Sequence, residues 1–162
     1  MQETQVSKIR TATEIREPKE EDVLEILFLI KKFYKKAGYE VTGKFDQKKA
    51  LPLVEGIVQN ESYFKRVVTV DGEITGAVAF TVAANPFSNT KIGTEIFFWL
   101  EEGLTSSHTF LRLLRMYEKW CKDQNCKTYK FGVVPSDNSN KLEKTLVKLG
   151  FVKAEEAFIK EI

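Results

Sequence analysis

The chain has 162 residues, of which 43% are hydrophobic and 30% charged, and its formal net charge is +2. This length suits one domain with a sizeable core of its own, which we place at residues 10–162 behind a flexible polar tail at 1–9. A net charge so near zero supplies no strong field, which argues against a nucleic-acid surface that depends on phosphate contacts.

We expect the chain to stay in the cytoplasm. Residues 1–9 contain no apolar stretch of the kind that a secretory signal needs. No apolar run approaches the ~20 residues that cross a membrane, so we expect no membrane association. The two cysteines, Cys121 and Cys126, match no zinc-binding spacing, which favours reduced thiols.

The first third of the chain predicts one strand and two helices. Residues 11–16 alternate between polar and apolar side chains and end before Pro18, as a strand does. Between Pro18 and Gly38, apolar residues recur at helical spacing, and acidic residues occupy the first turn, where the helix dipole favours them. A second helix is predicted at 46–60.

The middle of the chain predicts a β-hairpin and a central strand. Residues 64–70 and 74–83 are rich in β-branched side chains. They flank Asp71-Gly72, a pair that fits a two-residue hairpin turn because both residues tolerate positive φ. Residues 94–100 are nearly all apolar, so we expect a strand that is buried on both faces.

The last third alternates helix and strand. Apolar spacing predicts an amphipathic helix between Phe110 and Trp120, whose stripe we expect to share a core with Phe97 or Trp99. The elements predicted after it are a strand, a helix and a short closing strand pair, at 129–134, 138–149, 151–153 and 157–160.

This order implies a right-handed crossover, so the strand at 129–134 is expected to lie parallel to and beside the one at 94–100. The hairpin, in contrast, is antiparallel. We therefore predict an α/β (α+β) fold, with a mixed β-sheet of about six to seven strands and helices on both faces.

Three local stretches are similar to ones in the GNAT superfamily of acyl-CoA-dependent N-acetyltransferases. Residues 15–22 look like the family's opening strand and helix, and residues 70–76 (VDGEITG) look like its hairpin. Residues 146–151 (LVKLGF) resemble its closing helix-to-strand junction. Their joint order resembles the GNAT fold over nearly the whole chain. Phage proteins with this fold, some enzymatic and some virion-associated, look similar in the last third.

The resemblance implies that acetyl-CoA is the acyl donor and that the loop before the third helix binds its pyrophosphate through free amides and the helix dipole. The corresponding residues here are Thr105, Ser106, Ser107, His108, Thr109 and Phe110. Serine and histidine stand where the family has glycines, and Phe110 brings a bulky ring to a place where backbone should approach phosphate. A shift of one residue would instead put Phe110 in the helix, facing the core. The stretch also suits an ordinary helix cap.

Glu95 is the candidate general base. It begins the strand at 94–100, where members of the family often carry a catalytic glutamate. Its apolar neighbours would desolvate the carboxylate and raise its pKa towards the range that is useful for catalysis. The alternative is an outward-facing glutamate at the end of a strand.

Two further groups are expected to contact the pantetheine arm of CoA. The resemblance implies that the backbone of Trp99 and Leu100 pairs with this arm as an added strand would, and that a backbone N–H polarises the thioester. Asn138 and Asn140 flank the position of the family's loop asparagine. Both asparagines also suit a turn and a helix cap.

The general acid of the family has no direct counterpart. Leu146 stands where a tyrosine is common, which leaves Tyr117 and Tyr129 as candidate substitutes unless they are core residues. His108, the only histidine, is a candidate phosphate donor or a proton relay to the leaving thiolate. It equally suits a plain polar position at a helix start.

Two functions of different classes follow. The first is an N-acetyltransferase that moves an acetyl group from acetyl-CoA to a small-molecule or protein amine, without a metal. The second is a catalytically silent GNAT-like domain that serves as a binding or virion-associated structural module, which the altered loop and the missing tyrosine favour. A homodimer or a virion partner is open in either case, in the host cytoplasm if the chain is a phage protein.

Overall fold

The computed structural model describes residues 12–101, 107–134, 138–160 and 162. The predicted tail and the start of the domain, up to residue 11, lie outside this range. The strands are β1 (Thr13–Arg16), β2 (Phe64–Val70), β3 (Glu73–Ala84), β4 (Lys91–Leu100) and β5 (Cys126–Tyr129). The helices are α1 (Val23–Lys36), α2 (Gln47–Gln59), α3 (Ser107–Asp123) and α4 (Ser139–Lys148), with 3-10 turns η1 (Glu20–Asp22) and η2 (Tyr39–Thr42).

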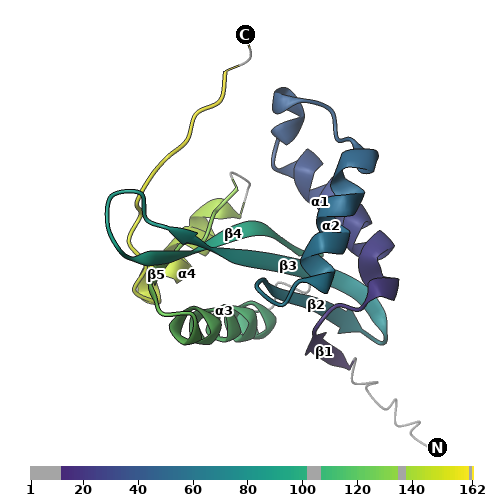
Figure 1. Ribbon diagram of the computed structural model, residues 1–162, viewed down its shortest axis with the longest axis horizontal. Helices are drawn as coiled ribbons and strands as arrows, with labels where there is room; N and C mark the ends of the chain where they lie inside the picture. Colours follow the sequence, from purple (N-terminus) through teal and green to yellow (C-terminus); the bar gives the residue numbers. More distant parts are fainter. Residues whose placement is uncertain (1–11, 102–106, 135–137, 161) are drawn as a thin grey trace, which may run out of the picture.

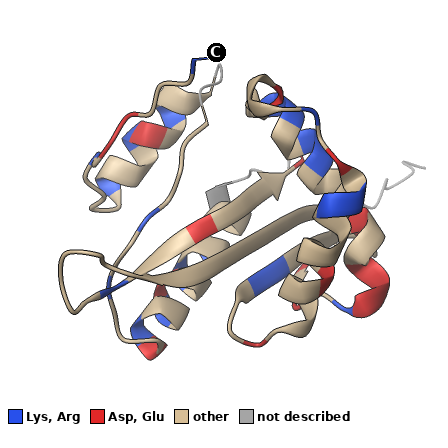
Figure 2. Ribbon diagram, turned by 45° about the horizontal axis from the view of Figure 1, so that its top comes forward, with Lys and Arg blue, Asp and Glu red and all other residues tan. Residues whose placement is uncertain are grey.

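The sheet follows chain order, β1-β2-β3-β4-β5. The pairs β1–β2, β2–β3 and β3–β4 are antiparallel, and β5 runs parallel to β4, as the crossover through α3 predicts. Figure 1 shows α1 and α2 over one face of the sheet and α3 over the other. In Figure 2 the central strands are mostly uncharged, and the charged residues lie mainly on the helices and connections.

The N-terminal strand and the first helix are joined by a partly buried ion pair. The Arg16 guanidinium donates to the two Asp22 oxygens at 2.6 and 3.0 Å, and it lowers the pKa of that carboxyl. Asp22 also accepts the Lys19 N–H at 2.7 Å. The acid therefore orders the first turn of the helical segment as well as the end of β1.

The two faces of β4 contact different cores, which corrects the expectation that Phe97 or Trp99 packs with the stripe of α3. Phe97 and Trp99 face α1 and α2, whereas Leu100 packs with Leu113 and Tyr117 of α3. Both faces of the strand are covered as predicted, but full burial along the apolar run is limited to Phe97 and Leu100.

The sheet has five strands among the described residues, not six to seven, because the end of the chain is not paired. The segment from 151 to 160 has no strand, although a strand pair was predicted there. The predicted strand at 129–134 is instead β5, Cys126–Tyr129. It ends early because Phe131 turns its ring onto Phe98 and Phe110, with centroids 5.0 and 5.6 Å away.

Replacing Leu114 tests whether the apolar stripe of α3 is packed in a core. Its side chain is buried with Phe110 and Leu146, so Leu114→Ala should lower the free energy of unfolding by about 2–5 kcal/mol through lost burial and a new cavity. Leu53→Ala, at an exposed position of α2, is the matched control and should change it by less than about 1 kcal/mol. Urea denaturation of both variants measures the difference, and equal small losses would show that the stripe of α3 is not packed.

Candidate active site

The site begins where β4, β5 and α3 touch at Gly93. A Cβ at this position would clash with Cys121 Sγ and would lie 2.7 Å from the Tyr117 hydroxyl and 3.0 Å from Tyr129 Cβ. Only glycine allows the three elements to come this close. The Lys130 N–H donates to the Gly93 carbonyl at 2.8 Å, and within the described residues the pairing of β4 with β5 goes no further than Gly93.

Beyond Gly93 the two segments separate, and a side chain replaces the backbone partner. The Gly132 N–H donates to Glu95 Oε2 at 3.2 Å instead of to a β4 carbonyl. The Glu95 carboxylate therefore lies where the strands part.

A β-bulge decides which face Glu95 occupies. Glu95 pairs with Phe80 and Phe97 pairs with Ala79, which leaves Ile96 as the extra residue of β4. Phe80 belongs to the core under α3. Since paired residues share a face of the sheet, Glu95 is on the α3 side and Phe97 on the α1 side. The outward-facing alternative is thereby corrected.

The half-buried Glu95 has an unusual affinity for protons. Burial raises the pKa of its carboxyl to about 7, and the hydrogen bond from the Gly132 N–H works in the opposite direction. Burial dominates because one backbone donor does not replace the water that a carboxylate loses. A carboxyl with a pKa near neutrality can accept and release a proton at physiological pH.

At its other end, β4 presents backbone groups on alternate sides. The Glu101 N–H donates to the Thr75 carbonyl of the strand's neighbour at 2.8 Å. Backbone hydrogen bonds alternate along an antiparallel pair of strands. Trp99 therefore bonds to Ala77 through its N–H and C=O groups. The N–H and C=O groups of Leu100, which lies opposite Gly76, point away from β3. The backbone N–H and C=O groups of Phe98 point in the same direction as those of Leu100. Sequence reasoning named Trp99 and missed Phe98, because it could not know the register.

The side chain of Trp99 lies in the other layer. Its ring packs with the core between the sheet and α1, and the Lys36 ammonium lies 5.7 Å from the ring centroid. The nearby Lys32 forms an ion pair with Glu101 at the end of β4. These contacts hold α1 against the end of β4, on the face opposite α3.

The phosphate loop predicted from the resemblance is described only in part. Thr105 and Ser106 lie outside the described residues, and α3 begins at Ser107. The His108 side chain is exposed in the first turn, and Thr109 is buried.

Phe110 does not obstruct the start of α3. It lies within the helix, and its ring meets Phe98 edge-on at 5.9 Å in the core. The obstruction expected from this ring is therefore absent, because the helix carries it to the inner face.

The remaining candidate residues, Asn138, Asn140 and Leu146, lie in α4 or directly before it. Asn138 precedes α4 and accepts the Leu142 N–H at 3.1 Å through its carbonyl, which is the backbone role of a cap, and Asn140 is exposed. Leu146 is buried and packs in the core beside α3.

Tyr117 and Tyr129, the two candidate substitutes for the missing tyrosine, both make contacts within the structure. Tyr117 is fully buried, and burial raises its pKa above the ordinary value. Tyr129 donates to Glu118 Oε2 at 3.4 Å. The Cys121 thiol is free and buried, with its pKa raised to about 12 by burial, and Cys126 is free as well. Tyr117 is therefore not exposed, whereas Tyr129 is partly buried.

Within the described ranges, no group of three or more histidine, cysteine or acidic residues is arranged to hold a metal ion. No described helix is both long and apolar enough to cross a bilayer.

The fold is shared with known acetyltransferases. Aminoglycoside N-acetyltransferase AAC(6')-Iy in complex with CoA superposes with a TM-score of 0.72 at 13% identity, over 96% of this chain and 97% of that one. A GCN5-related N-acetyltransferase from Ralstonia eutropha has a TM-score of 0.68 at 12% identity, over 92% and 98%. A GNAT family acetyltransferase from Staphylococcus aureus has 0.60 at 18%, over 93% and 98%.

The chain has the GNAT fold. At these identities the likeness concerns the fold itself. No family model matches the sequence, and no curated protein matches it. Within the GNAT fold, Gly93, Phe98 and Gly132 are the site residues that the sequence did not single out. The signal available for Gly93 was a glycine inside an apolar strand, which often marks a close approach of other groups.

The pKa of Glu95 predicts a pH-dependent stability difference. Its folded-state pKa of about 7 exceeds the ordinary 4.5, so the folded state holds more protons between these values, and stability falls as pH rises through this window. Glu95→Gln removes this term, so its stability relative to the wild type should rise by on the order of 1–3 kcal/mol from about pH 4 to pH 8.

Thermal unfolding at a series of pH values measures this difference. Glu55→Gln, on an exposed face of α2, controls for the loss of one negative charge. A difference between Glu95→Gln and the wild type that stays constant with pH would show that Glu95 is not desolvated.

Proposed function

We propose that the protein is an N-acetyltransferase that moves an acetyl group from acetyl-CoA to an amine. The observation that carries this proposal is the half-buried Glu95 carboxyl, with a pKa of about 7, at the point where β4 and β5 separate. The likeness of the fold to acetyltransferases, one of them in complex with CoA, supports it.

The backbone of β4 offers a fitting surface for the pantetheine arm. Beyond Gly93, β4 has no strand partner on the β5 side within the described residues, and Phe98 and Leu100 direct their N–H and C=O groups to that side. An extended arm can pair with these groups as an added strand would. Backbone contacts do not depend on side-chain identity, so this surface tolerates sequence change.

The start of α3 would hold the phosphates. The first N–H groups of a helix lack intrahelical partners and attract anions, and those from Ser107 to Phe110 are the relevant ones here. The Phe110 ring is turned into the core, so it does not cover these groups. The exposed His108 suits a contact with phosphate better than a role at the reacting thioester, because it shares this end of the helix.

Glu95 would act as the general base. Acetyl-CoA supplies an activated thioester when bound. The Glu95 carboxylate would take a proton from the acceptor ammonium, directly or through one water, so that the free amine can bond to the acetyl carbon while the carbon–sulfur bond breaks. The proton that the nitrogen then loses would pass to the leaving thiolate, directly or through water, which gives the amide and the CoA thiol. A thiol has a pKa near 8.5, so a thiolate leaves readily near neutral pH. The absence of a tyrosine at Leu146 therefore does not prevent the reaction.

One of the features that favoured a silent module, the expected obstruction by Phe110, is not found. The obstruction by Phe110 is absent, and Glu95 has the environment of a base, not that of a solvated residue. The amine that accepts the acetyl group is a separate question, and a panel of small amines and peptides would address it.

Binding of acetyl-CoA is the first test. Acetyl-CoA at about 100 times its dissociation constant should stabilise the folded protein by about 2.7 kcal/mol, which a thermal-shift assay detects. Calorimetry gives the affinity directly, and Ser107→Trp should weaken it by adding bulk beside the first amides of α3. A wild type that does not bind acetyl-CoA at millimolar concentration would refute the proposal and leave only the fold.

Glu95→Gln tests the base. The substitution keeps the shape and removes the basicity, so the rate of CoA thiol release with an amine that is turned over should fall about 10²–10⁴-fold. Acetyl-CoA affinity should stay within about threefold of the wild type, because the carboxylate faces the amine and not the phosphates.

The pH profile supplies the independent readout. In the wild type, kcat/KM should rise with pH through about 7, as the Glu95 carboxyl loses its proton, and Glu95→Gln should lack this step. A variant that keeps both the rate and the profile would remove Glu95 from the mechanism.

A further inference from the structure

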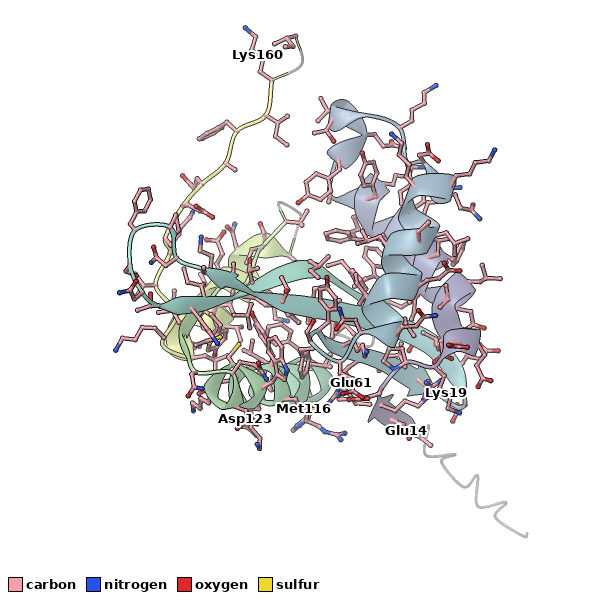
Figure 3. All side chains as sticks on the ribbon, in the orientation of Figure 1. Glu14, Lys19, Glu61, Met116, Asp123 and Lys160 are labelled. Carbon is pink, nitrogen blue, oxygen red and sulfur yellow. The ribbon has the colours of Figure 1, made fainter. Side chains whose placement is uncertain are left out.

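The two cysteines of the chain lie on either side of one tight turn. Cys121 belongs to the end of α3, and Cys126 is the first residue of β5. Gln124 and Asn125 connect the helix to the strand, and Asn125 has a left-handed φ of 58°. Figure 1 shows the chain turning back from α3 into β5, and Figure 3 labels Asp123 at the end of the helix. A left-handed residue after a helix reverses the chain, which brings β5 back alongside α3.

A bulge in β5 turns Cys126 towards α3. Cys126 lies opposite Lys91, and farther along the pair Tyr129 lies opposite Gly93. The strand β5 therefore has one more residue than β4 over this stretch, and Lys127 is the extra one. Because of it, Cys126 shares a face of the sheet with Tyr129, whose ring packs against α3. Without the bulge, the Cys126 side chain would point to the other face.

The two thiols meet in the same core. Cys121 is 2% exposed, and the partly exposed Cys126 packs against the cluster to which Cys121 belongs. Burial raises the pKa of the Cys121 thiol to about 12, and the neighbouring Cys126 thiol adds to the increase. One thiol affects the ionisation of another only at short range. The structure thus places a buried sulfur beside one that solvent reaches.

We propose that Cys121 and Cys126 are an oxidisable dithiol, which closes to a disulfide bond within one chain when the protein meets a peroxide. The bond joins the end of α3 to the start of β5. The chain has no third cysteine, so one intramolecular disulfide is the product. This proposal concerns the fold and does not rest on the proposed enzyme activity.

The oxidation proceeds in two steps, and hydrogen peroxide is a sufficient oxidant. The Cys126 sulfur attacks one peroxide oxygen, the oxygen–oxygen bond breaks, and the other oxygen leaves as water with the thiol proton. Cys126 is then a sulfenic acid. The Cys121 sulfur displaces its hydroxyl group, which leaves with the Cys121 proton as a second water. Two thiols and one peroxide give one disulfide and two waters.

The positions of the two sulfurs assign these roles. An oxidant reaches Cys126 first, because this residue is partly exposed. The thiolate is the nucleophile in the second step, so the high pKa of Cys121 makes that step slow. The closeness of the two sulfurs offsets this, since a neighbouring thiol reacts as if it were highly concentrated.

The disulfide restrains the strand that borders the Glu95 site. β5 is short, and within the described ranges β4 is its strand neighbour. A short edge strand opens locally at low cost. A covalent link from Cys126 to α3 limits the conformations of the opened strand and so disfavours opening. The segment that follows β5 carries the Gly132 N–H, which donates to Glu95, so the bond holds one side of this site in place.

Thiol counting tests the oxidation. The reduced wild type is treated with hydrogen peroxide, unfolded, and alkylated with N-ethylmaleimide. We expect both thiols to be lost together, the mass to fall by two hydrogens, and a non-reducing gel to show single chains. Dithiothreitol should restore both thiols. Loss of one thiol alone, or a disulfide that joins two chains, would refute the proposal.

Two serine variants separate the roles of the sulfurs. Cys121→Ser should accumulate the Cys126 sulfenic acid, which dimedone traps, because the second thiol is missing. Cys126→Ser should react with peroxide about 10-fold or more slowly than the wild type, because the remaining thiol is buried. A Cys126→Ser variant that reacts as fast as the wild type would contradict these roles. The thiol count of the wild type decides the disulfide itself even if a variant does not fold.

Amide exchange tests the restraint on β5. The Lys130 N–H, which donates to the Gly93 carbonyl at 2.8 Å, should exchange about 10-fold or more slowly in the oxidised protein than in the reduced one. The amides of β2 are the control, since β3 and β4 separate this strand from β5, and they should change by less than about twofold. Equal exchange at Lys130 in the two states would show that the bond does not restrain the strand.

Discussion

The close contact at Gly93 is the constraint on which the rest of the site depends. No side chain fits between β4, Tyr117, Cys121 and Tyr129, so the strand meets α3 and β5 at this one point. The next segment of the chain, at Phe131, turns inward to the aromatic core beside Phe98. β4 and β5 are thus paired as far as Gly93, and their chains separate beyond it. Both segments are anchored in packed cores on either side of this point.

One inserted residue in β4 links this geometry to acid–base chemistry. The bulge at Ile96 turns Glu95 towards the α3 layer and leaves Phe97 on the α1 layer. A carboxylate in that position loses water and gains a single backbone donor, from Gly132. Its ionised form is therefore costly, and the fold stores in Glu95 a group that readily takes up a proton. Such local costs to stability are common where proteins carry out chemistry.

In the proposed function, the groups that would bind the acyl donor belong mostly to the backbone. The alternation that turns Phe98 and Leu100 away from β3 follows from pairing alone, and the amides at the start of α3 exist in any helix. Under the proposed function, binding through such groups depends little on the identity of the side chains that the sequence carries there.

The sequence by itself determined the elements whose causes are local. The hairpin and its turn were predicted almost to the residue, because Asp71 and Gly72 adopt the positive φ values of 52° and 90° that a two-residue turn requires. The stripe of α3 and the helix before Gly150 follow from spacing in the same way. The parallel placement of β4 and β5 also followed, since the handedness of a crossover is a general rule.

Only the tertiary structure decided the features that rest on contacts between distant residues. The bulge at Ile96 has no signature in an apolar run, so neither the face of Glu95 nor the partners of Phe97 and Trp99 could be inferred. β5 ends at Tyr129 because the Phe131 ring packs against Phe98 of β4 and Phe110 of α3, which both lie far earlier in the chain. The expected closing strands needed a turn that Ala154–Glu156 does not supply. Burial and register are properties of the packed chain, and they set the pKa, the direction of each backbone group and the open edge of the sheet.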